Sequence, residues 1–121
     1  MSLILIVDDS PTEVYVIRRA LERSGYRTAC AADGAEGIRM AKAMKPDLIF
    51  MDIVMPGVNG YQATRALAAD PTTKRIPIIM VTSKSQETDR IWGLRQGAVD
   101  YLVKPVSAKQ LVEKAQEALA G

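Results

Sequence analysis

Five residues that could bind a metal ion or a phosphate follow the short apolar runs of this sequence. Asp8 and Asp9 follow the first run, Asp52 and Thr82 follow two later runs, and Lys104 follows a weaker one. Crowded carboxylates repel one another, and a bound cation relieves that repulsion. Oxygen ligands suit Mg²⁺, which favours a phosphate as a further ligand, and a carboxylate can itself attack phosphorus. The residue types therefore indicate phosphoryl chemistry, with Asp52 as nucleophile because the adjacent Asp8 and Asp9 form a natural metal pair.

These residues can act together only if the fold brings the ends of their apolar runs to one place. The runs are short, continuous and rich in β-branched residues, which is typical of strands buried on both faces. Strands are predicted at 3–7, 26–31, 48–51, 78–81 and 100–103. Helical periodicity and end signals predict helices that start at Ser10, Asp33 and Ser107, and helices over 61–69 and 86–96.

Five alternating strand–helix units predict an α/β fold with a parallel sheet covered on both faces. The expected form is a doubly wound (βα)5, flavodoxin-like three-layer sandwich with five parallel strands in the order 2-1-3-4-5. The strand order then reverses between the first and third strands, which carry the acidic residues. Because the carboxyl ends of parallel strands share one edge, all five candidate residues are expected to meet there. The length of 121 residues predicts a single domain over 1–121 without an output domain.

Two helix starts beside this edge carry specific capping predictions. The segment Ser10-Pro11-Thr12-Glu13 has the pattern of a capping box, in which Ser10 and Glu13 bond each other's backbone N–H groups. Thr82 and Ser83 offer hydroxyls ahead of the fourth helix, and we expect Ser83 or a neighbour to cap it.

Composition excludes several classes of function. The absence of histidine rules out Ser-His-Asp catalysis and HExxH zinc sites, and the spacing of the eight glycines excludes GxGxxG and P-loop motifs. A net charge of +2 gives no indication of nucleic-acid binding. No apolar run approaches the ~20 residues that a membrane span needs, and no signal peptide is expected. The single Cys30 cannot form an internal disulfide, which suits a cytoplasmic protein.

The candidate residues and their neighbours resemble the receiver domain of bacterial response regulators, the CheY-like family. The matching residues are Asp8-Asp9, Asp52 with Met55-Pro56-Gly57-Val58-Asn59-Gly60, Thr82, and Lys104-Pro105. The resemblance covers the whole chain in spacing and order. It implies that Asp52 is the phosphoacceptor and that Asp8 and Asp9 hold Mg²⁺ together with it. It also implies that Thr82 and Lys104 each bind an oxygen of the phosphoryl group.

The same resemblance assigns three further features. The main-chain carbonyl of Ile53 or Val54 would be a metal ligand, and the family pattern favours Val54. Tyr101 matches the aromatic switch residue, although ordinary packing of a tyrosine near a strand end remains open as well. The Lys104-Pro105 bond matches a cis peptide of the family.

Several strings outside the chemistry-bearing residues are similar to PilH-type single-domain regulators of the chemotaxis-like pathway that controls type IV pili and twitching motility. These strings lie at 9–13, 52–57, 61–65, 86–89, 92–93 and 95–98. The likeness implies a cytoplasmic, monomeric signalling protein that is phosphorylated by a histidine kinase in a magnesium-dependent way. Its output would be a protein–protein contact through the fourth helix, fifth strand and fifth helix, or removal of phosphate from the kinase as a phosphate sink. No enzymatic activity is expected beyond its own phosphorylation and dephosphorylation.

Two other functions stay open on sequence grounds. One is an interaction module that works without phosphorylation, against which the intact set of candidate residues counts. The other is a phosphatase of the haloacid dehalogenase type, which places an acid two residues after its nucleophile. Val54 stands there and has no proton to donate. Val54 and Lys84 occupy positions that influence phosphate hydrolysis in the family, so the phosphate lifetime is also open.

Overall fold

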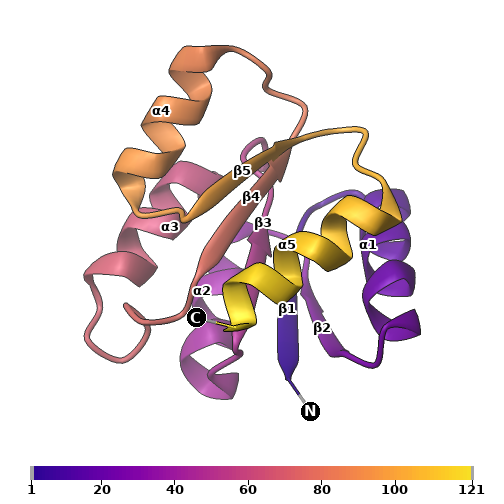
Figure 1. The fold of residues 1–121 in the computed structure, drawn as a ribbon. Helices are drawn as coiled ribbons and strands as arrows, with labels where there is room; N and C mark the ends of the chain where they lie inside the picture. The colour runs from indigo at the N-terminus through magenta and orange to yellow at the C-terminus, as the bar shows by residue number, and fades with distance from the viewer. Residues whose placement is uncertain (1, 121) are drawn as a thin grey trace.

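The computed structural model describes residues 2–120, which form a five-stranded parallel sheet between two layers of helices (Figure 1). The strands are β1 (Leu3–Val7), β2 (Arg27–Ala31), β3 (Leu48–Met51), β4 (Ile78–Thr82) and β5 (Asp100–Val103). The helices are α1 (Pro11–Arg23), α2 (Gly34–Met44), α3 (Gly60–Ala69), α4 (Glu87–Gln96) and α5 (Ala108–Ala120). Neighbouring strands follow the order β2-β1-β3-β4-β5, which confirms the predicted doubly wound sheet. Within the residues described, no helix has the length and apolar content to cross a membrane.

The sheet is buried on both faces because successive side chains of a strand point to opposite sides. In β1, Ile4 and Ile6 pack with buried residues of α1 and α5, whereas Leu5 and Val7 pack with those of α2 and α3. Figure 1 shows the corresponding layers, with α1 and α5 together on one side of the sheet. A third, smaller cluster of buried side chains lies between β4, β5 and α4.

The start of α1 differs from the predicted capping box in one of its two bonds. The Ser10 hydroxyl accepts the Glu13 N–H at 3.3 Å, as predicted. The reciprocal bond is replaced, because the Ser10 N–H donates to Asp8 Oδ1 at 2.9 Å. The Glu13 carboxylate instead lies 3.8 Å from the ammonium of Lys104. Glu13, the acid of the predicted capping box, therefore belongs to the candidate site instead.

Ser83, which was predicted together with its neighbours as the cap of the fourth helix, does not cap it. Gln86 is the N-cap residue of α4, and its N–H donates to Asp89 Oδ2 at 3.2 Å. The Thr82 hydroxyl is already engaged, since it accepts the Lys84 N–H at 3.3 Å in the turn that leaves β4. Four residues, 83–86, thus separate the strand from the helix.

The loop between β3 and α3 approaches the end of β3 so closely that only glycine fits at its far end. The Gly60 N–H donates to the Ile53 carbonyl at 2.9 Å, and a Cβ at Gly60 would collide with the Asp52 carbonyl oxygen. Gly57 has a φ of +73°, a left-handed conformation that glycine adopts without strain. These two glycines close the loop against Asp52.

Candidate functional site

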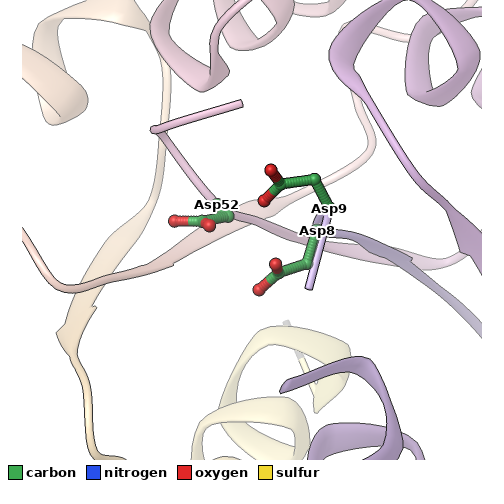
Figure 2. Close-up of side chains that lie close together, drawn as sticks. All are labelled: Asp8, Asp9 and Asp52. Carbon is green, nitrogen blue, oxygen red and sulfur yellow. The ribbon is translucent and has the colours of Figure 1, made fainter. Parts of the chain in front are cut away.

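Three carboxylates meet at the carboxyl edge of the sheet, where β1 and β3 end side by side. One oxygen from each of Asp8, Asp9 and Asp52 lies within 4.8 Å of the other two, and Figure 2 shows the three side chains gathered there. The sheet fixes this position, because the Asp8 N–H donates to the Ala31 carbonyl at 3.0 Å and the Asp52 N–H to the Val7 carbonyl at 2.9 Å. Asp8 is 3% and Asp52 8% exposed, whereas Asp9 is open to solvent.

Lys104 brings a positive charge into this acidic group from the end of β5. Its ammonium donates to Asp8 Oδ2 at 2.9 Å and lies 3.5 Å from Asp52 Oδ2. The peptide bond from Lys104 to Pro105 is cis. Burial lowers the pKa of Lys104, but the hydrogen bond to Asp8 and the charges of Asp8, Asp52 and Glu13 outweigh burial and leave that pKa above its usual value. The lysine is therefore held in its charged form among the acids.

The Asp52 carboxylate is the acid whose charge the surroundings disfavour. Burial raises its pKa, and the neighbouring charge of Asp8 raises it further. Lys104, the Thr82 hydroxyl and the Ile53 N–H, which donates to Asp52 Oδ1 at 2.7 Å, act in the opposite direction without cancelling the rise. A buried acid left in this state gains from any additional positive charge nearby.

Thr82 and Tyr101 lie beside these charges and are both buried. Thr82 has no exposed surface and Tyr101 is 8% exposed. The Tyr101 hydroxyl donates to the Lys84 carbonyl at 2.8 Å, and burial raises the pKa of this phenol. Its ring packs where α4 has Gly93, since a Cβ there would lie 3.2 Å from the ring and 2.6 Å from Met80 Sδ. Tyr101 is thus a packed residue in this structure, and its role as a switch stays a prediction.

The remaining predicted ligand, Val54, has a side chain that is 60% exposed. It lines a shallow pocket of about 230 Å³ that is also lined by Lys84 and Tyr61. The role of its main-chain carbonyl, like that of the Ile53 carbonyl, stays a prediction.

Three residues at this edge were not predicted from the sequence to be part of the site. Glu13 extends toward Lys104, and its capping pattern was the local signal that placed it at the start of α1. Tyr61 and Asp89 meet across α3 and α4, with the Tyr61 hydroxyl donating to the Asp89 carbonyl at 3.2 Å. A contact between positions 28 residues apart leaves no periodic trace in a sequence.

Comparison with known proteins agrees with this geometry. The chain is 53% identical to the protein PilH of Pseudomonas aeruginosa over 121 residues, which cover all of both chains. The structure matches chemotaxis protein CheY4 of Vibrio cholerae with a TM-score of 0.92, 31% identity and coverage of 98% of this chain and 99% of the other. It also matches the receiver domain of the Pseudomonas aeruginosa sensor histidine kinase PA1611 with a TM-score of 0.92, 36% identity and coverage of 99% and 98%. That receiver domain was solved with a magnesium ion coordinated in its active site cleft.

The family model of the response regulator receiver domain matches residues 4–116, a span that contains every residue of the acidic edge described above. Sequence and fold agree over nearly the full length, and the chain belongs to the response regulator receiver domain family.

Proposed function

We propose that this protein is a phosphorylation-controlled signalling switch in which Asp52 accepts a phosphoryl group from a histidine kinase. The observation that carries the proposal is the meeting of a buried Asp52 with the charged Lys104 and the acids Asp8 and Asp9 at one edge of the sheet. Phosphoryl transfer depends mainly on positioning and on neutralising charge, and this group supplies both.

The acidic group fits a magnesium ion. The carboxylates of Asp8, Asp52 and Glu13 lie within 3.8 Å of the ammonium of Lys104, and Asp9 adds a fourth carboxylate, so the group carries excess negative charge. The Asp9 carboxylate has no hydrogen-bond or ion-pair partner among residues 2–120. Such hard oxygen donors select Mg²⁺ over softer metals. Asp8, Asp9, Asp52 and the carbonyl of Val54 would hold the ion, which when bound supplies positive charge that offsets the phosphoryl oxygens.

Asp52, Lys104 and Thr82 each have a separate role in the transfer. An oxygen of Asp52 forms a bond to phosphorus while the bond from phosphorus to the kinase's histidine nitrogen breaks, and that nitrogen keeps the electron pair. The ammonium of Lys104, now 2.9 Å from Asp8, reaches a phosphoryl oxygen as a charge-assisted hydrogen-bond donor. The hydroxyl of Thr82 donates to another phosphoryl oxygen.

Binding of the Thr82 hydroxyl to the phosphoryl group links the chemistry to the surface. That movement withdraws the hydroxyl from the Lys84 N–H and makes room for the ring of Tyr101 beside it. The surface of α4, β5 and α5 is repacked as a result. This face has apolar side chains ready for a partner protein, since Ile91, Trp92 and Val103 are 40%, 49% and 42% exposed.

The 53% identity to PilH over the full length supports a place in a chemotaxis-like pathway that controls type IV pili and twitching motility. In this proposal the protein acts in the cytoplasm as a monomer. Its output is contact with a partner protein.

Labelling with a small phosphodonor tests the phosphoacceptor directly. Incubation with radiolabelled acetyl phosphate and Mg²⁺ is expected to give acid-labile label on the wild-type protein and none on the Asp52→Asn variant. Asp47→Asn is the matched control, because Asp47 lies at the opposite end of β3, where it accepts the Leu3 N–H. It should be labelled like the wild type. Label retained in Asp52→Asn would exclude Asp52 as the sole acceptor.

The Lys104→Ala variant separates phosphorylation from the response to it. We expect label to be incorporated while the change in Trp92 fluorescence on phosphorylation becomes weaker, because Lys104 no longer couples the phosphoryl group to β5. An unaltered fluorescence response would remove Lys104 from the switch.

The pathway assignment is tested in cells. Deleting the gene should change surface spreading driven by type IV pili, and a copy encoding Asp52→Asn should fail to restore it. Normal spreading in the deletion strain would contradict the assignment but leave the phosphoacceptor untouched.

A further inference from the structure

A closed ring of contacts passes beside the pocket lined by Ile53, Val54, Tyr61 and Lys84, and it includes residues that were not assigned above. From Asp52 it passes through the loop closed by Gly60 to the neighbouring Tyr61, whose hydroxyl lies 3.5 Å from Asp89 Oδ1. From Asp89 it continues to Lys84, whose ammonium lies 3.8 Å from the same oxygen. The Lys84 N–H returns to the Thr82 hydroxyl, which borders Asp52. The ring joins the two sides of the site across α3 and α4.

Lys84 is the point at which most of these contacts meet. Its N–H is held by Thr82, its carbonyl by the hydroxyl of Tyr101, and its ammonium by Asp89. Its side chain is 39% exposed and lines the pocket of about 230 Å³ together with Val54. A cation is thus held at a pocket that is also lined by the two residues following Asp52, and it is paired with an acid that belongs to α4.

Asp89 keeps that cation turned toward the helix. Besides its contact with Lys84, Asp89 accepts the Gln86 N–H, which fixes the carboxylate at the start of α4. Asp52, by contrast, has the ammonium of Lys104 as its cationic neighbour, 3.5 Å away. A phosphoryl group on Asp52 would add negative charge next to the pocket and compete with Asp89 for the ammonium of Lys84.

We propose that Asp89 is a positioning residue that holds Lys84 away from the phosphoacceptor and thereby shortens the life of the phosphorylated state. Without the charge of Asp89, the ammonium of Lys84 turns to the phosphoryl oxygens and stabilises them. This inference rests on the proposed phosphorylation of Asp52. It assigns to α4 a second connection to the site, separate from Thr82 and Tyr101.

The test measures how long the label persists after the phosphodonor is removed. Asp89→Asn keeps the size and hydrogen-bonding capacity of the side chain but loses its charge. It is expected to lengthen the half-life of the label about 1.4- to fivefold, which corresponds to the free energy that exposed ion pairs typically contribute. Glu87→Gln is the matched control, since Glu87 is an acid in the same helical turn and pairs with Arg90 rather than Lys84. Asp89→Glu should return the half-life toward that of the wild type.

A double-mutant cycle distinguishes positioning from a loss of helix structure. In the Lys84→Gln background, Asp89→Asn is expected to leave the half-life unchanged, because the residue through which Asp89 acts is gone. The lengthening in Asp89→Asn alone should also shrink as salt concentration rises, since both charges are partly exposed. A change of equal size with and without Lys84 would overturn the proposal, as would an Asp89→Asn half-life equal to that of the wild type.

The outcome for the wild type separates the two proposals. If the wild type takes up no label at Asp52, both the phosphoacceptor and the role of Asp89 are wrong. If it is labelled normally but Asp89 and Lys84 show no coupling, only the role of Asp89 fails.

Discussion

Helices α1 and α4 both begin just after residues of the site, yet they are attached to the sheet very differently. Helix α1 buries Ile17, Ala20 and Leu21 in the larger core cluster and packs against α5. The buried residue of α4 is Gly93, which has no side chain, and Leu94 is partly buried next to it. Helix α1 is therefore anchored to the sheet by buried apolar side chains, whereas α4 has few such contacts.

The two junctions repeat this contrast. The start of α1 is joined to the site by Asp8 itself, whose Oδ1 accepts the Ser10 N–H. The start of α4 is separated from Thr82 by residues 83–86, and this segment is held by the Tyr101 hydroxyl and by Asp89. The polar contacts of residues 83–86 can break and re-form with other partners without disturbing the core.

The two helices thus divide the site into a firmly anchored side and a loosely anchored side. Segments with few buried apolar contacts open at lower free energy than the core does. Asp8 and Asp9 therefore lie next to the firmly anchored helix, and Thr82 lies next to the helix with few buried apolar contacts.

The largest expected effect is the removal of an anchor from α1. Leu21→Ala should lower the free energy of unfolding by about 2–5 kcal/mol, because Leu21 is fully buried and its loss leaves a cavity. Ile91→Ala on α4 should cost less than about 1 kcal/mol, since Ile91 is 40% exposed. Urea unfolding followed by circular dichroism measures both. Equal costs would show that α4 is anchored as firmly as α1.

A side chain placed under α4 should be the next most costly change. Gly93→Ala would push a methyl group against Met80 and the ring of Tyr101, which typically costs about 1–3 kcal/mol. The better helix propensity of alanine returns about 1 kcal/mol of this. We expect a net loss on the order of 1 kcal/mol by urea unfolding. Arg95→Ala, an exposed position of the same helix, is the control and should change stability little. A stabilised Gly93→Ala variant would mean that α4 shifts freely.

The acidic side of the site should lower stability as the pH rises in metal-free buffer. The pKa of Asp52 is raised in the folded state above its unfolded value of about 3.9, so the folded protein binds this proton more tightly. The contribution of Asp52 to the free energy of unfolding then falls as the pH rises from about 4 through the raised pKa.

Asp52→Asn removes this effect and isolates it. The variant and the wild type should unfold with similar free energy near pH 4, and the variant should be the more stable of the two at pH 7. Urea unfolding across the pH range measures the difference. Mg²⁺ should favour the wild type. A wild type that is more stable than the variant at pH 7 without metal would contradict the idea that burial and Asp8 disfavour the Asp52 charge.

The smallest effect concerns the two N-caps. Ser10→Ala removes the bond to the Glu13 N–H and should cost about 1 kcal/mol, as losses of side-chain caps typically do. Gln86→Ala should cost only a few tenths of a kcal/mol, because the Gln86 N–H keeps its bond to Asp89. Thermal unfolding resolves the two. A larger loss of stability in Gln86→Ala than in Ser10→Ala would show that the cap of α4 is the more stabilising of the two.

The comparison also explains which features could be predicted from the sequence. The sheet order and the meeting of Asp8, Asp52 and Lys104 follow from apolar runs with polar residues at their ends, and these signals are local. The start of α1 was predicted only in part, because Asp8 replaces Glu13 as acceptor of the Ser10 N–H. That replacement depends on the neighbouring strand end rather than on spacing.

The span of α4 was predicted to within one residue, but its capping residue was predicted wrongly for the same physical reason. A hydroxyl close to a helix start favours a cap, but Thr82 bonds the Lys84 N–H and Gln86 is the N-cap residue. The contact of Tyr61 with Asp89 joins two helices, and no local pattern records it. At the start of α4, where few apolar side chains are buried, contacts between residues distant in sequence determine the local structure.

The glycine under α4 has a consequence for how such proteins diversify. The buried residue of α4 is a glycine, so the packing of the core constrains the other positions of this helix very little. Natural selection can rewrite its outer surface, including Ile91 and Trp92, at little cost to folding. Relatives within one cell can therefore share one phosphorylation chemistry while each acquires a different partner, which limits crosstalk between their pathways.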